Sequence, residues 1–239
     1  GAGANTVSMT SLLWQRAPGG DAFPPVVGEY NWDWDTGTPG VEFPQGIAYF
    51  VTGRYLRALD LATRTVLWSY DLGLAGTPTG FAAPVVANNN GSAPGFGDGV
   101  VYVGGKDGML HAVNARWGYD QWRTDVGGDI SKASPVIGDD GAVYVVEDAA
   151  IDRLIVVSHT GAVRGWANIG AAAGTSAPAY DSASDCIFVG GDKLYGFSIS
   201  GAPCTGWATG SYALGALTTV PGAPLIAGDN RQIILDMPR

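Results

Sequence analysis

Residues 99–127 read GVVYVGGKDGMLHAVNARWGYDQWRTDVG, and this stretch decides the fold class. A β-rich run around Tyr102 is followed by a Gly- and Asp-containing turn, a second apolar run, a polar turn and Trp122. Apolar residues that alternate over short runs, with tight turns between the runs, are typical of an antiparallel meander. The stretch therefore predicts three consecutive strands of one sheet.

The same pattern occurs at residues 46–73, 141–170 and 185–210, with Tyr49, Tyr144 and Phe188 in place of Tyr102. A short Pro-containing run precedes each meander, and one more lies near the C-terminus. These runs are residues 23–27, 83–86, 134–137, 177–180 and 223–226. Proline lacks an N–H and is tolerated at the start of a strand. A short strand plus a three-stranded meander, repeated about every 40–50 residues, predicts the four-stranded antiparallel blades of an all-β propeller.

Tryptophan spacing predicts the number of blades. Trp14, Trp68, Trp122, Trp166 and Trp207 recur at repeat-length intervals, and the chain ends together supply one more interval. We therefore expect a single five-bladed domain whose closing blade is shared by residues 222–239 and residues 1–17. The other blades are expected at about residues 23–73, 83–127, 133–170 and 176–210.

Two motifs resemble a known family. Residues 57–63 (RALDLAT) with Val66-Leu-Trp68, and residues 101–114 (VYVGGKDGMLHAVN) with Trp122, look like the repeat of pyrroloquinoline-quinone-type propellers. The resemblance covers the whole chain, most strongly residues 46–127. It implies that tryptophan docks one blade onto the next, so we expect equivalent, largely buried docking residues. These are Trp14, Trp68, Trp122, Trp166 and Trp207.

The resemblance specifies the fold better than the function. Enzymes of the family hold the quinone and a calcium ion in the channel, with an Asp base and often two adjacent cysteines. This chain has no adjacent cysteines, but residues 30–36 (YNWDWDT) resemble a Trp-Asp-aromatic-Asp stretch of those enzymes. Asn31, Asp33 and Asp35 also alternate as calcium ligands do, although the glycine and glutamate of a calcium loop are displaced. A metal site and a structural aromatic loop both remain open, and we favour the loop.

No other constellation predicts catalysis. His111 falls in a predicted strand and His159 in a polar turn, where hydrogen-bonded histidines are ordinary. Asp98-Gly99, Lys106-Asp-Gly108 and Asp139-Asp-Gly141 are typical of hairpin turns. No serine lies in a Gly-x-Ser-x-Gly turn. We therefore predict no catalytic residues.

Cys186 and Cys204 are the two cysteines of the chain. Cys186 opens the first strand of a predicted meander and Cys204 falls in its last turn, at the same end of the blade. A disulfide and two separate buried thiols are both compatible with this placement, and we favour the disulfide. A disulfide would place the protein outside the cytoplasm.

Two long linkers lie in consecutive predicted blades, at residues 28–45 and 87–98. Both join the Pro-containing strand to the meander, so they should emerge side by side on one face. They carry the candidate binding residues Tyr30, Trp32, Trp34, Phe43 and Phe96. Aromatic loops on a rigid scaffold suit a protein or glycan partner, while a self-packed cover over one mouth of the propeller is the alternative.

Composition narrows the functional classes. The 239 residues include 13 Lys and Arg against 22 Asp and Glu, a net charge of −9, which disfavours nucleic acid and anionic lipid as partners. No apolar run approaches the roughly 18 residues of a transmembrane segment. The chain opens with residues 1–4 (GAGA) and no Met, which we interpret as a processed mature form or an excised domain.

We therefore expect a non-catalytic, extracytoplasmic structural or protein-interaction module. Its partners would be proteins, identical subunits among them. The N-terminal segment, containing Val7, Met9, Leu12 and Leu13, would complete the closing blade of its own chain or be donated to a neighbour, giving a filament. The alternative is a quinoprotein-like oxidoreductase, or a calcium-binding relic of one.

Overall fold

The computed structural model describes residues 26–28, 32–33, 38–39, 46–73, 81–87, 99–170, 176–205, 207, 211–212, 224–227 and 232–234. Within these ranges the chain consists of strands and turns. It contains no helix there whose length and hydropathy would suffice to cross a bilayer. The prediction of an all-β protein is confirmed.

Four antiparallel sheets of four strands each make up most of the structure. Blade 1 contains β1 (Val26–Gly28), β4 (Ile47–Thr52), β5 (Tyr55–Asp60) and β6 (Val66–Asp71). Blade 2 contains β7 (Val85–Ala87), β8 (Val100–Gly104), β9 (Met109–Asn114) and β10 (Asp120–Asp125). Blade 3 contains β11 (Val136–Ile137), β12 (Val143–Glu147), β13 (Arg153–Val157) and β14 (Val163–Asn168). Blade 4 contains β15 (Ala179–Asp181), β16 (Cys186–Gly190), β17 (Leu194–Ser198) and β18 (Ser211–Tyr212).

Two further sheets have two strands each. One pairs β19 (Leu225–Ala227) with β20 (Gln232–Ile234), and the other pairs β2 (Trp32–Asp33) with β3 (Thr38–Pro39). The first pair lies where the inner strands of a closing blade are expected. Residues 1–17, which should supply its outer strands, lie outside the described residues.

The innermost strand of every blade begins directly after a proline. Strands β7, β11, β15 and β19 follow Pro84, Pro135, Pro178 and Pro224. Proline there removes no ladder hydrogen bond, and its fixed φ suits an extended chain. The Pro-containing runs of the sequence thus mark the inner strands.

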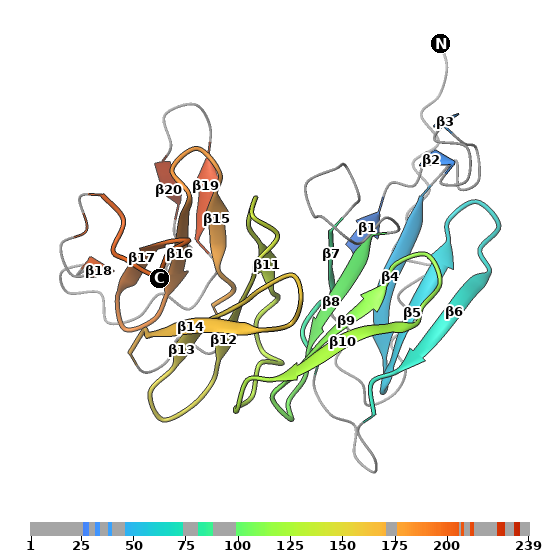
Figure 1. The fold of residues 1–239 in the computed structure, drawn as a ribbon, viewed down its shortest axis with the longest axis horizontal. Helices are drawn as coiled ribbons and strands as arrows, with labels where there is room; N and C mark the ends of the chain where they lie inside the picture. The colour runs from blue at the N-terminus through green and yellow to red at the C-terminus, as the bar shows by residue number, and fades with distance from the viewer. Residues whose placement is uncertain are drawn as a thin grey trace.

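These inner strands contact one another in series: β1 with β7, β7 with β11, β11 with β15, and β15 with β19. Figure 1 shows the resulting arrangement, with β11 near the middle, blades 1 and 2 on one side of it and blade 4 on the other. The sheets therefore follow one another around a common axis, as propeller blades do.

The apolar core lies between the blades. Strands β8, β12 and β16 are buried along their whole length because each is covered on both faces by neighbouring sheets. Alternate residues of each strand belong to different clusters: Tyr144 packs toward blade 4, whereas Val143 and Val145 pack toward blade 2. Because successive residues face opposite sides of a sheet, the strand register determines which cluster each side chain joins.

Candidate functional site

The junction between blades 1 and 2 is closed by Trp68. Trp68 pairs with Ala58, and its indole Nε1 donates a 3.1 Å hydrogen bond to the carbonyl of Ala115 in blade 2. Tyr49 Oη donates to the same carbonyl at 3.0 Å. Gly118 in the same turn has φ 74°, and a Cβ there would come within 2.4 Å of the indole. The indole and the glycine turn are therefore complementary.

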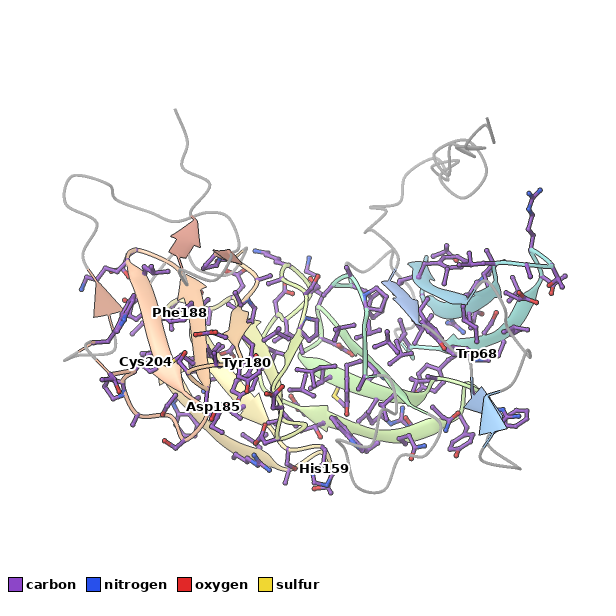
Figure 2. All side chains as sticks on the ribbon, turned by 90° about the horizontal axis from the view of Figure 1, so that it is seen from above. Trp68, His159, Tyr180, Asp185, Phe188 and Cys204 are labelled. Atoms are coloured by element: carbon purple, nitrogen blue, oxygen red, sulfur yellow. A yellow bond between two sulfur atoms is a disulfide. The ribbon has the colours of Figure 1, made fainter. Side chains whose placement is uncertain are left out.

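The junction between blades 2 and 3 repeats this geometry. Trp122 pairs with Ala112 and donates from Nε1 to the carbonyl of His159 at 2.8 Å. The Tyr102 and Trp122 ring centroids are 5.6 Å apart. A Cβ on Gly161 would lie 2.9 Å from the Trp122 ring. Figure 2 labels Trp68 and His159, one from each of these two junctions.

Trp207 takes the corresponding place on blade 4. Its ring lies 5.5 Å from Phe188, and a Cβ on Gly196 would come within 3.2 Å of it. Phe188 pairs with Gly196 as Tyr49 pairs with Ala58. Trp68, Trp122 and Trp207 are each half-buried rather than largely buried, because each lies toward the outer edge of its blade.

Trp166 is different, and the prediction that it is equivalent and buried is wrong. Its side chain is 63% exposed. In blade 3, Tyr144 pairs with Val156, and Val156 pairs with Gly165 rather than with a tryptophan. Trp166 pairs with Ile155, whose side chain belongs to the cluster facing blade 2. A one-residue shift in register has placed its indole on the opposite face of the sheet.

The shift leaves a hollow between blades 3 and 4, which we call the Gly165 hollow. It has a volume of about 230 Å³, and its walls include Tyr144, Val156, Gly165, Phe197, Ile199 and Gly201. A Cβ on Gly165 or on Gly201 would meet no other atom within 4 Å. Nothing in the described residues therefore occupies the place that Trp68 and Trp122 fill at the other two junctions.

One residue that lines the hollow has a buried hydroxyl. Tyr144 is 1% exposed, and its Oη has no hydrogen-bond partner among the described residues. Burial raises the pKa of this phenol, with the charge of Asp140 adding to the effect, so Tyr144 is protonated at neutral pH. At the first junction the equivalent Tyr49 Oη donates to the turn carbonyl of the next blade.

The predicted disulfide is confirmed. Cys186 and Cys204 are bonded, with their Cα atoms 6.1 Å apart, and no described cysteine is free. Both residues are buried with Phe188, and Trp207 packs against them. The bond therefore fixes the last turn of blade 4 beneath Trp207; Figure 2 labels Phe188 and Cys204 in this blade.

The two histidines lie in different surroundings. His111 lies in β9, is 1% exposed and has an edge contact with Tyr70. Burial lowers the pKa of His111, with Asp107 and Asp120 opposing and Arg123 reinforcing the shift. His159 lies in the turn that receives Trp122 and contributes its backbone carbonyl to that contact.

The described carboxylates mostly build turns and ion pairs. Asp60, Asp107 and Asp140 each accept a hydrogen bond from the backbone N–H two residues further on. Glu147 forms a bidentate ion pair with Arg153. No three His, Cys, Asp or Glu side chains in the described ranges come together to hold a metal ion.

Several predicted site residues lie outside the described residues. They are Val7, Met9, Leu12, Leu13, Trp14, Tyr30, Asn31, Trp34, Asp35, Phe43 and Phe96. Trp32 and Asp33 form strand β2, whose backbone pairs with Pro39 and Thr38. The predicted binding face and the metal loop therefore stay predictions.

Sequence reasoning missed Gly165 and Gly201. A signal was present: Trp68 and Trp122 each precede their blade's closing glycine, Gly73 or Gly127, by five positions, whereas Trp166 precedes Gly170 by four. Aligning the repeats on these glycines puts Gly165 opposite Trp68 and Trp122.

Repeated four-stranded antiparallel sheets, joined by tryptophans that dock on the next sheet, define a β-propeller of the pyrroloquinoline-quinone-like repeat class. A family model described as outer membrane protein assembly factor BamB matches residues 52–231. The chain belongs to this family, and the resemblance noted in the sequence is confirmed.

Comparisons with solved structures and with curated proteins were also made. One solved structure found is the crystal structure of BamB from Moraxella catarrhalis, with 19% sequence identity and a TM-score of 0.47. The alignment covers 65% of this chain and 43% of that one, so the chain matches less than half of that protein's length. No curated protein matches the chain.

Proposed function

We propose that this chain is a non-catalytic, extracytoplasmic propeller that binds protein partners, as an assembly factor does. The observation that carries the proposal is the family match over residues 52–231, to a model described as an outer-membrane protein assembly factor. The disulfide supports a location in an oxidising compartment. The use of the described carboxylates in turns and ion pairs supports a scaffold over an enzyme.

The outer strands and their turns offer surfaces for such partners. The exposed large apolar side chains are Val66, Leu67, Trp117, Tyr119, Ile151, Val163 and Trp166. Trp117 and Tyr119 lie in the turn before β10, and Val163 and Trp166 lie in β14. Exposed aromatic residues of this kind are enriched at protein interfaces.

Site-specific photo-crosslinking in the producing cells tests this function. A photoreactive phenylalanine analogue at Trp117 or Trp166 should give discrete adducts of higher mass, because these side chains point into solvent. The same analogue at Ser182, an exposed turn position, is the matched control. Absence of adducts at both tryptophans, or the same adducts at Ser182, would contradict a protein-binding role.

The proposal includes a five-bladed ring closed by residues 1–17. The pair β19–β20 has two strands among the described residues, whereas each preceding blade has four. An unpaired edge on β20 would expose backbone donors and acceptors, which folded proteins avoid. The segment with Val7, Met9, Leu12 and Leu13 supplies the missing strands, and we favour closure within the same chain over donation to a neighbour.

Deletion of residues 1–16 separates these arrangements. Closure within the chain predicts a destabilised monomer, because the last blade loses its outer strands. Donation between chains predicts that the intact protein forms filaments and that the truncated protein is monomeric and binds an added peptide of residues 1–16. Full stability of the truncated protein would contradict both arrangements.

A further inference from the structure

The same docking position occurs at three successive blade junctions, and the described structure fills two of them. At the first two junctions an indole lies against a glycine turn and donates Nε1–H to a backbone carbonyl, of Ala115 or of His159. The third turn, residues 198–201, has the hydrogen-bonding pattern of the second. The backbone N–H of Ser158 donates to the carbonyl of Ala162, and the backbone N–H of Ser198 donates to the carbonyl of Ala202. The carbonyl of Ile199 thus corresponds to that of His159.

The third position is built to receive a ring. Gly165 has no side chain at the position that Trp68 and Trp122 occupy in the earlier blades. Gly201 lies in the facing turn, at the position where Gly118 and Gly161 contact the indoles. Phe197 stands where the earlier junctions have Val113 and Val157, so one wall is aromatic. Tyr144 lines the hollow, and its buried Oη has no hydrogen-bond partner in the described part of the chain. A volume of about 230 Å³ is below the roughly 300–1,000 Å³ of ordinary ligand pockets and suits one side chain.

Trp166 of the same chain does not reach this position. Its neighbours in sequence, Gly165 and Ala167, face blade 4, so its own side chain faces blade 2. The Arg153 guanidinium lies 5.7 Å from the centre of the Trp166 ring, and Arg153 is itself bound to Glu147. Moving the indole into the hollow would require the whole strand to shift by one residue.

We propose that the Gly165 hollow binds a tryptophan side chain presented by a protein partner. The indole inserts between Gly165 and Gly201, packs on Phe197 and donates Nε1–H to the carbonyl of Ile199. It thereby completes in a complex the contact that Trp68 and Trp122 make within the chain. The assignment of the indole to another protein rests on the proposed function, whereas the presence of a binding site for an indole does not.

A short peptide tests the hollow without knowledge of the partner. The probe is N-acetyl-Gly-Trp-Gly-amide, the control is N-acetyl-Gly-Ala-Gly-amide, and binding is measured by ligand-observed nuclear magnetic resonance. We expect saturable binding of the Trp peptide in the millimolar range that one buried side chain gives, and none of the Ala peptide.

Substitutions then locate the binding. Gly165→Trp should fill the hollow from within, since Gly165 does not have a positive φ and its Cβ would enter open space. It should weaken peptide binding at least about tenfold and raise the melting temperature. Ser182→Ala, at an exposed turn position outside the hollow, should leave binding unchanged. Gly165→Leu, which also enters the hollow, serves if Gly165→Trp does not fold.

Three results would overturn the inference. One is absence of Trp-peptide binding to the intact protein, which would mean that the hollow is already filled or closed. Another is full binding in folded Gly165→Trp or Gly165→Leu. The third is concentration-dependent self-association that is lost in Gly165→Trp, which would assign the hollow to a second copy of this chain. None of these affects crosslinking at Trp117, so the proposed function would be judged separately.

Discussion

Replacing Trp122 with alanine probes the contact that joins blade 2 to blade 3. The indole is half-buried, so about 100 Å² of apolar area is lost, which corresponds to about 2.5 kcal/mol. Loss of the ring contact with Tyr102 adds about 1 kcal/mol, and loss of the hydrogen bond to the His159 carbonyl adds about 1 kcal/mol. The expected decrease in the free energy of unfolding is about 4.5 kcal/mol, within the range for Trp→Ala substitutions in cores.

Urea denaturation followed by circular dichroism measures this decrease, and a thermal scan should show a fall of about 10 °C. Trp166→Ala is the matched control, because it removes the same side chain from the equivalent strand of the next blade. With its indole 63% exposed and stacked on Arg153, that variant should lose about 1 kcal/mol or less.

Equal losses for the two variants would refute the register described for blade 3. So would a larger loss for Trp166→Ala, since it would mean that Trp166 is the docking residue and that Gly165 is not opposite Val156. A loss below about 1 kcal/mol for Trp122→Ala would refute the docking role of the indole itself.

Three further predictions concern the disulfide, a buried histidine and metal ions. Cys204→Ser should lower the free energy of unfolding by about 3 kcal/mol. In the unsubstituted protein, thiol titration after unfolding without reduction should find no free thiol, and two free thiols would contradict the bond. Burial holds the pKa of His111 below 6.5, so the unfolded state takes up its proton first and stability is lost as the pH falls below about 6.5. His111→Phe should show less of this loss in urea titrations at pH 7 and pH 5, and an unchanged loss would assign it to other groups. Chelation with EDTA should leave the melting temperature unchanged, while a fall restored by calcium would support the loop of Asn31, Asp33 and Asp35 as a metal site.

Much of the fold could be predicted because its signals are local. Alternation of apolar residues predicted the meanders, and the prolines marked the inner strands. Asp107-Gly108 and Asp140-Gly141 marked the hairpin turns before β9 and β12. Each signal depends on a few neighbouring residues, which act through backbone conformation and period-two burial. The disulfide was predictable for the same reason, since both cysteines belong to one blade.

The vacant junction was harder to predict because it depends on register. A search for tryptophan at repeat-length intervals accepts Trp166, since a shift of one residue barely changes the spacing. In a strand, a shift of one residue moves a side chain to the opposite face of the sheet. The shift therefore places Gly165, and not the indole of Trp166, at the docking position. The pairing of Tyr144 with Val156, and of Val156 with Gly165, shows the change in the structure. In the sequence its signal is the spacing from Trp166 to Gly170, which is one residue shorter than in the first two blades.

An experimental structure of the protein with bound N-acetyl-Gly-Trp-Gly-amide tests most directly whether the junction of blades 3 and 4 is a site for a partner's tryptophan. We predict the peptide's indole between Gly165 and Gly201, with Nε1 in hydrogen-bonding distance of the Ile199 carbonyl and Trp166 on the opposite face of β14. A peptide bound elsewhere, or a side chain of the protein itself in the Gly165 hollow, would contradict it.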